Sequence, residues 1–144
     1  MKIGIANDHR GYNLKNELVK YLKSRGYEVI DYGSDTVYSV DYPDFAFKLC
    51  NGVVNKEVDF GIAICGTGIG MSISANRFKG IRASVCHNSL EARLTREHND
   101  ANILCMGARI IGPETALENA KVFLSSTFSG GRHIRRIEKI DEGI

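Results

Sequence analysis

The chain of 144 residues lacks any long apolar segment, and this absence limits what it can be. No run approaches the roughly 18 apolar residues that a membrane-spanning helix needs. The first residues, Met1 to Ala6, form only a short apolar run that ends at Asn7-Asp8, which is typical of a first strand rather than of a signal peptide. We therefore expect a cytoplasmic protein that makes no contact with a membrane.

The chain also lacks the patterns of disulfide-stabilised, metal-binding and nucleic-acid-binding proteins. No two of its four cysteines form a C-x-x-C pair, so we expect neither a disulfide framework nor a zinc site. The formal net charge is only +2, which is too small to indicate nucleic-acid binding. Basic residues gather instead in one C-terminal segment, Arg132-His133-Ile134-Arg135-Arg136.

Short apolar segments alternate with helical patterns along the whole chain. Helical spacing is clear at Leu14, Leu18 and Leu22, and Pro43 and Pro113 can each open a helix at its first turn. Further helices are expected after the third strand up to about residue 76, at 89–97 and at 132–140. Strands are predicted at residues 2–7, 28–32, 60–65, 82–86 and 103–106.

These predicted strands are uninterrupted apolar runs, and such runs are typical of a parallel sheet covered on both faces. No internal repeat, low-complexity stretch or linker divides the chain. We therefore expect a single domain over residues 1–144. Its predicted fold is a doubly wound, Rossmann-like α/β fold with a five-stranded parallel sheet, helices on both faces and a C-terminal helical arm.

A glycine-rich loop, Gly66-Thr67-Gly68-Ile69-Gly70, directly follows the third predicted strand. Ligands of open parallel sheets bind beyond the carboxyl ends of the strands, so this is a candidate site. A dinucleotide fingerprint is disfavoured because the next strand ends in Val85-Cys86-His87, with no acid for a ribose. A P-loop is disfavoured because no Gly-Lys-Ser/Thr follows. The loop could instead bind an anion that forms during a reaction.

Cys65 stands directly before this loop, where a thiol is unexpected. Backbone N–H groups of a glycine loop and the N-terminus of the following helix can stabilise an oxyanion. Helix N-termini also favour the thiolate form of cysteine, which can act as a nucleophile or as a base. We interpret Cys50, Cys86 and Cys105 as small buried hydrophobic residues, and His87 as a solvated side chain.

Six short motifs resemble, in their order along the chain, the family of type B ribose-5-phosphate isomerases and galactose-6-phosphate isomerase subunits. The resemblance extends from the first strand to the C-terminal segment. The motifs are Asp8-His9-Arg10-Gly11-Tyr12, Asp41-Tyr42-Pro43-Asp44, Cys65-Gly66-Thr67-Gly68-Ile69-Gly70, Ile73-Ser74-Ala75-Asn76, His98-Asn99-Asp100-Ala101-Asn102 and Gly130-Gly131-Arg132-His133.

The resemblance implies an aldose–ketose isomerase that works through a cis-enediolate, without metal, nucleotide or other cofactor. Cys65 would be the base that moves a proton between carbons 1 and 2 of the open-chain sugar. The backbone of Gly66, Thr67, Gly68, Ile69 and Gly70, with the Thr67 hydroxyl, would hold the enediolate oxygen. Some relatives use a downstream acid instead, but the segment after this loop has no carboxylate before Glu91.

The same resemblance implies further substrate contacts. His98 would act as the acid that opens the sugar ring, and Asp8 and Asn99 would bind sugar hydroxyls. The phosphate would be bound by His9, Arg109, Arg132 and Arg136, because arginine forks match phosphate oxygens. Of the two neighbouring arginines, Arg136 and not Arg135 fits the motif G-G-R-H-x-x-R.

The family resemblance also implies a homodimer, or a dimer of such dimers, with the active sites at the interface and the basic arm reaching across. Ribose 5-phosphate is the expected substrate, because this chain contains every element of the site. A hexose 6-phosphate such as allose or galactose 6-phosphate, and a non-catalytic sugar-phosphate binding protein, remain alternatives. A redox role is disfavoured because Cys65 has no nearby resolving cysteine. Contacts of Arg10 and Tyr42 with the substrate are left open.

Overall fold

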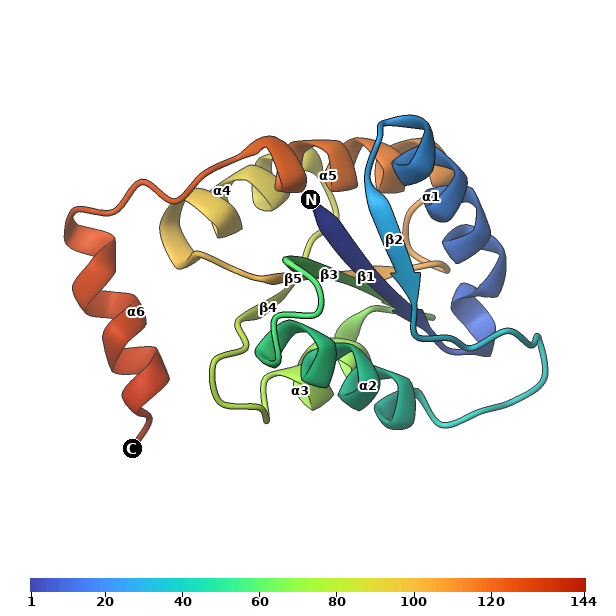
Figure 1. The fold of residues 1–144 in the computed structure, drawn as a ribbon, viewed down its shortest axis with the longest axis horizontal. Coiled ribbons are helices and arrows are strands. Elements are labelled where there is room, and N and C mark those ends of the chain that lie inside the picture. Colours follow the sequence, from blue (N-terminus) through green and yellow to red (C-terminus); the bar gives the residue numbers. More distant parts are fainter.

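A five-stranded parallel sheet forms the centre of the computed structural model, which describes residues 1–144 (Figure 1). Neighbouring strands follow the order β2-β1-β3-β5-β4, and every pairing is parallel. The expected doubly wound α/β fold is thereby confirmed. The strands are β1 (Lys2–Asn7), β2 (Glu28–Asp31), β3 (Phe60–Cys65), β4 (Ala83–Val85) and β5 (Ile103–Gly107).

Helices cover both faces of this sheet. On one face α4 packs on α5 and α5 on α1, and on the other face α2 packs on α3 (Figure 1). A separate hydrophobic cluster fills the space between the sheet and each helical layer. The helices are α1 (Tyr12–Ser24), α2 (Tyr42–Val54), α3 (Ile69–Ala75), α4 (Ser89–Asn99), α5 (Pro113–Ser125) and α6 (Arg132–Glu142), with a short 3-10 helix η1 (His9–Gly11) after β1.

The strand order places the crevice of the sheet between β1 and β3. From this pair the connections proceed in opposite directions, to β2 on one side and to β5 and β4 on the other. In open α/β sheets ligands bind at such a switch point, beyond the carboxyl ends of the strands. The segments that leave β1 and β3 there are Asp8-His9-Arg10 and the glycine loop that begins after Cys65.

Element boundaries differ from the predicted ones mainly at the outer strand β4 and in the helix α4 that follows it. The predicted strand at 82–86 is a strand of only three residues, Ala83–Val85. The helix predicted at 89–97 continues to Asn99 and ends at Asp100, whose φ of 45° stops further helical turns. His98 and Asn99 therefore lie in the last turn of α4.

The C-terminal helix α6 stands apart from the rest of the molecule (Figure 1). It has no buried residue, although its isoleucines at 134, 137 and 140 recur with helical spacing. This confirms the expected helical arm. None of the helices is long and apolar enough to cross a membrane.

Candidate active site

The thiol of Cys65 faces the backbone of the glycine loop. Cys65 is the last residue of β3, and only 4% of it is exposed. The backbone N–H of Gly68 donates a hydrogen bond to Cys65 Sγ over 3.1 Å. This bond ties the sulfur to the glycine loop. The turn also bonds internally, because the Ile69 N–H donates to Thr67 Oγ1 over 3.2 Å.

Two glycines allow this loop to pack against the end of β5. Gly68 has a φ of +80°, and a Cβ there would lie 2.9 Å from the carbonyl carbon of Met106. A Cβ on Gly107 would lie 2.6 Å from the carbonyl carbon and oxygen of Thr67. Side chains at either position would push the loop away from β5, and with it the N–H that bonds to Cys65.

The loop after β1 forms the opposite wall of the crevice. Asp8 is 5% exposed, and its Oδ1 accepts hydrogen bonds from the backbone N–H groups of Arg10 at 2.9 Å and Gly11 at 3.2 Å. The other carboxylate oxygen, Oδ2, makes no hydrogen bond within the chain. His9 Nδ1 accepts from the Val40 N–H over 3.2 Å. The proton of a neutral His9 is therefore on Nε2, which can donate to a ligand.

Two arginines border the glycine loop. The backbone N–H of Arg109 donates to the Gly66 carbonyl over 3.0 Å. A Cβ on Gly66 would lie 3.4 Å from Arg109 Cδ and 3.7 Å from Arg10 Cγ. The Cys65 side of the sheet thus combines a thiol, backbone donors and two cations, a set that suits an anionic substrate.

Arg10 and Tyr42 are residues near the loop that sequence patterns did not resolve. The ring of Tyr42 packs over Gly70, where an added Cβ would lie only 2.7 Å from the ring carbons. Both residues belong to motifs that supported the family resemblance. Neither position could be assigned from the sequence, because the contacts join segments that are far apart along the chain.

Within one chain, His98 and Asn99 do not lie close to Cys65. Helix α4 starts after β4 and returns to the amino edge of the sheet, where β5 begins. Cys65 lies at the carboxyl edge, paired with Gly107 at the far end of β5. A strand of this length spans about 13 Å at roughly 3.3 Å per residue, so the two groups are well beyond contact distance.

The arm α6 lies beside His98 and not beside Cys65. The rings of His98 and His133 stack with their centroids 4.5 Å apart and an interplanar angle of 13°. The pKa of His133 is below its ordinary value because the ring is partly removed from water and faces His98, Arg132 and Arg136. The predicted residues thus form two groups. One surrounds Cys65, and the other contains His98, Asn99, Arg132 and Arg136.

The other three cysteines lie inside the protein. Burial raises the pKa of Cys50 to about 12 and is the main cause that raises the pKa of Cys86 to about 11. Burial also raises the pKa of Cys105 well above its usual value. These thiols therefore stay protonated near neutral pH and behave as small hydrophobic residues. No three His, Cys, Asp or Glu side chains gather in a way that could hold a metal ion.

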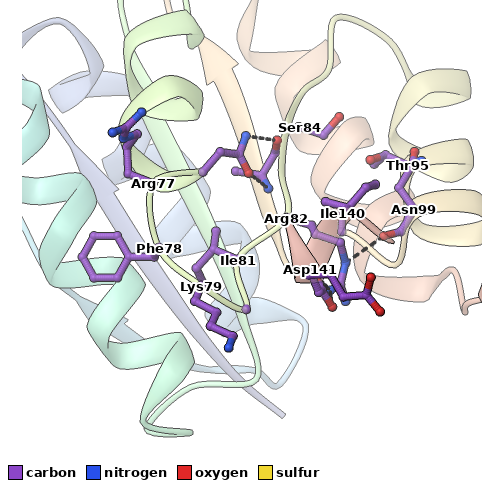
Figure 2. A pocket seen from close by; sticks show the side chains of 15 residues that line it. Arg77, Phe78, Lys79, Ile81, Arg82, Ser84, Thr95, Asn99, Ile140 and Asp141 are labelled. Atoms are coloured by element: carbon purple, nitrogen blue, oxygen red, sulfur yellow. Dashed lines mark hydrogen bonds and ion pairs between the residues drawn. The ribbon is translucent and has the colours of Figure 1, made fainter. Parts of the chain in front are cut away.

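A groove of about 590 Å³ lies on the His98 side of the molecule (Figure 2). Its lining comes from the segment that leads from α3 into β4, from α4 and the turn after it, and from the end of α6. Asn99 is the only predicted site residue that contributes to it. The groove contains neither the thiol nor the glycine loop, so it is not by itself a reaction site.

Comparison with known proteins finds relatives that match nearly the whole chain. The model of the ribose/galactose isomerase family matches residues 3–140. Ribose-5-phosphate isomerase B of Escherichia coli is 47% identical, over 96% of this chain and 93% of its own. The structure of Clostridium thermocellum ribose-5-phosphate isomerase B superposes with a TM-score of 0.98 at 56% identity, covering 99% of this chain and 96% of that one.

A second solved structure, a ribose 5-phosphate isomerase from Thermotoga maritima, superposes with a TM-score of 0.97 at 52% identity. The superposition covers 99% of this chain and 98% of the Thermotoga chain. The match therefore includes the sheet, the glycine loop and the arm together. This chain belongs to the ribose/galactose isomerase family.

Proposed function

We propose that this protein interconverts ribose 5-phosphate and ribulose 5-phosphate, with Cys65 as the base. The observation that carries the proposal is the Gly68 N–H placed 3.1 Å from Cys65 Sγ, at the switch point of the sheet. This contact holds the Cys65 sulfur against the glycine loop, at the position where the family's reaction needs a base. The relatives named as ribose 5-phosphate isomerases, at about half of all positions identical, support the choice of substrate.

The proposed reaction is a proton transfer between neighbouring carbons. The Cys65 thiolate removes the proton from carbon 2 of the open-chain aldose, and the released electron pair forms the carbon 1–carbon 2 double bond. The carbonyl oxygen on carbon 1 takes up the negative charge. After a proton moves from the oxygen on carbon 2 to the oxygen on carbon 1, the thiol returns its proton to carbon 1, and the ketose forms.

The glycine loop would stabilise the negatively charged intermediate. The backbone N–H groups of Gly66 to Gly70 lie on one turn with Cys65, and removal of one such donor in other enzymes costs about 3 kcal/mol. The phosphate would lie farther out, bound by Arg109 and His9 on this side. Asp8, with Oδ2 unoccupied, would accept a hydrogen bond from a sugar hydroxyl.

A complete site requires a second copy of the chain. His98, Asn99, Arg132 and Arg136 would act as ring-opening acid, hydroxyl ligand and phosphate ligands, yet they lie on the side of the molecule away from Cys65. In a homodimer, Cys65 of one chain would meet His98 of the partner subunit, and two equivalent sites would form. Exposed apolar side chains beside the loop, Ile69 at 55% and Ile73 at 64%, would become buried in such an interface.

The experiment that tests the proposal compares wild-type protein with the Cys65→Ala variant. We expect turnover of ribose 5-phosphate to fall by about 10²–10⁴-fold, the usual contribution of a base, while calorimetry shows retained binding of the sugar phosphate. Cys86→Ala, which removes a buried thiol away from the loop, is the matched control and should remain active. Retained turnover in Cys65→Ala would exclude the thiol as base.

Two alternatives are separated by substrate comparison. Higher kcat/KM on allose 6-phosphate or galactose 6-phosphate than on ribose 5-phosphate would assign the protein to hexose phosphates. Binding of all these sugars without any turnover would indicate a non-catalytic binding protein.

A further inference from the structure

The guanidinium group of Arg82 connects two elements that are far apart in the sequence. Arg82 precedes β4, and 15% of its side chain is exposed. Its Nε donates to the carbonyl oxygens of Asn99 at 2.9 Å and Asp100 at 3.2 Å. Its Nη1 donates to both carboxylate oxygens of Asp141, each over 2.8 Å (Figure 2). Arg82 thus bonds the end of α4 and the end of α6 at once.

The end of α4 depends on this arginine. Asp100 has a φ of 45°, in a region that residues other than glycine seldom adopt. Its Oδ2 accepts from Arg82 Nη2 over 3.4 Å, and its Oδ1 accepts from Arg96 Nη1 over 2.7 Å. Two arginines therefore hold the turn that directly follows His98 and Asn99.

Arg82 is itself well fixed. Its backbone N–H donates to Asn102 Oδ1 over 2.9 Å, and its carbonyl accepts from the Asn102 N–H over 2.9 Å. The backbone of Arg82 is therefore tied to the start of β5. A guanidinium held in this way can serve as a rigid support for both helix ends.

Two side chains of α6 make specific contacts with the body of the chain, one at each end of the helix. Asp141, in its last turn, makes the only ion pair between α6 and the rest of the chain. His133, in its first turn, stacks on His98. The segment before α6 is also tied to α4, because the Ser129 N–H donates to the Glu97 carbonyl over 3.0 Å. Since α6 has no buried residue, the pair of Asp141 with Arg82 is what fixes the far end of the arm.

We infer that Arg82 and Asp141 form a clasp that positions His98, by holding the arm so that His133 stays stacked on the His98 ring. The inference rests on the proposed function, in which His98 opens the sugar ring and α6 carries Arg132 and Arg136. Neither Arg82 nor Asp141 touches a reacting atom, so both are positioning residues. The clasp keeps the acid and the phosphate ligands of this half-site in one arrangement.

The test compares Asp141→Asn with Glu138→Gln, which removes the same charge from an exposed residue of α6 that has no bonded partner. In Asp141→Asn we expect kcat/KM for ribose 5-phosphate to fall by about 10–100-fold, since displacements of about 1 Å can cost that much. Asp141→Glu should recover part of the loss, and Glu138→Gln should match wild type. Thermal unfolding should be unchanged in all three, because α6 contributes nothing to the core.

A second readout needs no activity. In Asp141→Asn the imidazole NMR signals of His98 and His133 should shift, and in Glu138→Gln they should not. Unchanged signals, or equal losses of kcat/KM in both variants, would overturn the clasp. If wild-type protein fails to isomerise any sugar phosphate while the signals shift as expected, the proposed function fails and the clasp stands.

Discussion

Cys65 and His98 lie near opposite ends of the strands of the β-sheet. Cys65 is the last residue of β3 and lies at the carboxyl ends of the strands. His98 lies in the last turn of α4, which returns to the amino ends of the strands before β5. A reaction that uses both residues must therefore take them from two chains. If both residues take part in the reaction, the proposed homodimer is required for activity, and this requirement can be tested.

Mixing two inactive variants should restore activity. Cys65→Ala chains and His98→Ala chains, refolded together in equal amounts, should give heterodimers in which one of the two sites is intact. Random pairing in a two-fold dimer predicts roughly a quarter of wild-type activity. Each variant refolded alone is the control. If the mixture stays as inactive as its components, each site is built from a single chain.

Alkylation should distinguish Cys65 from the other thiols. Burial keeps Cys50, Cys86 and Cys105 protonated, with raised pKa values, and only the thiolate reacts readily. Native protein treated with iodoacetamide near pH 8 should therefore gain one label, at Cys65, as measured by intact mass and peptide mapping. Cys65→Ala should gain none. Equal labelling of a second cysteine in folded protein would contradict the assignment.

Two glycine substitutions should damage the loop, and a third should not. Gly68→Ala and Gly107→Ala place a Cβ 2.9 Å and 2.6 Å from backbone atoms, and overpacking of this kind costs about 1–3 kcal/mol. We expect a lower thermal midpoint and reduced turnover for both. Gly112→Ala, where a Cβ would meet nothing within 4 Å, should change stability by at most about 0.5 kcal/mol. A harmless Gly107→Ala would show that the loop is loosely packed.

Docking of the arm should depend on pH. The folded-state pKa of His133 is lowered by partial removal from water and by His98, Arg132 and Arg136. Its contribution to arm docking is thus present above the ordinary value of about 6.5 and is lost as the pH falls through the lowered pKa. An NMR titration of the His133 ring should show a midpoint below ~6.5, and His98→Gln should raise it. An ordinary midpoint in wild type would contradict the stacked arrangement.

The arm should contribute to substrate binding more than to the chemical step. Arg136→Ala should raise the KM for ribose 5-phosphate by about 10–100-fold, the value of one or two bonds to a charged group, with little change in kcat. Phosphate contacts persist through ground and transition states, which explains this pattern. Arg135→Ala removes the same charge about 100° around the helix and should behave like wild type. A reversed result would exchange the two roles.

Much of the architecture could be predicted from the sequence because its causes are local. Apolar runs at 2–7 and 60–65 predicted β1 and β3 with their observed bounds. Pro43 and Pro113 lie in the first turns of α2 and α5, where a missing N–H is tolerated. The position of the glycine loop directly after Cys65 likewise follows from neighbouring residues. The catalytic roles drawn from the family motifs remain predictions.

Only the tertiary structure decided which of these residues meet. Arg82 and Asp141 are 59 positions apart, and no periodicity links them. The contacts of Arg10 and Tyr42 with the glycine loop depend on how η1 and the start of α2 pack at the end of the sheet. The separation of His98 from Cys65 follows from the direction of α4 across the sheet. Such relations depend on long-range packing, whereas the strand, turn and cap signals of the sequence act over a few residues.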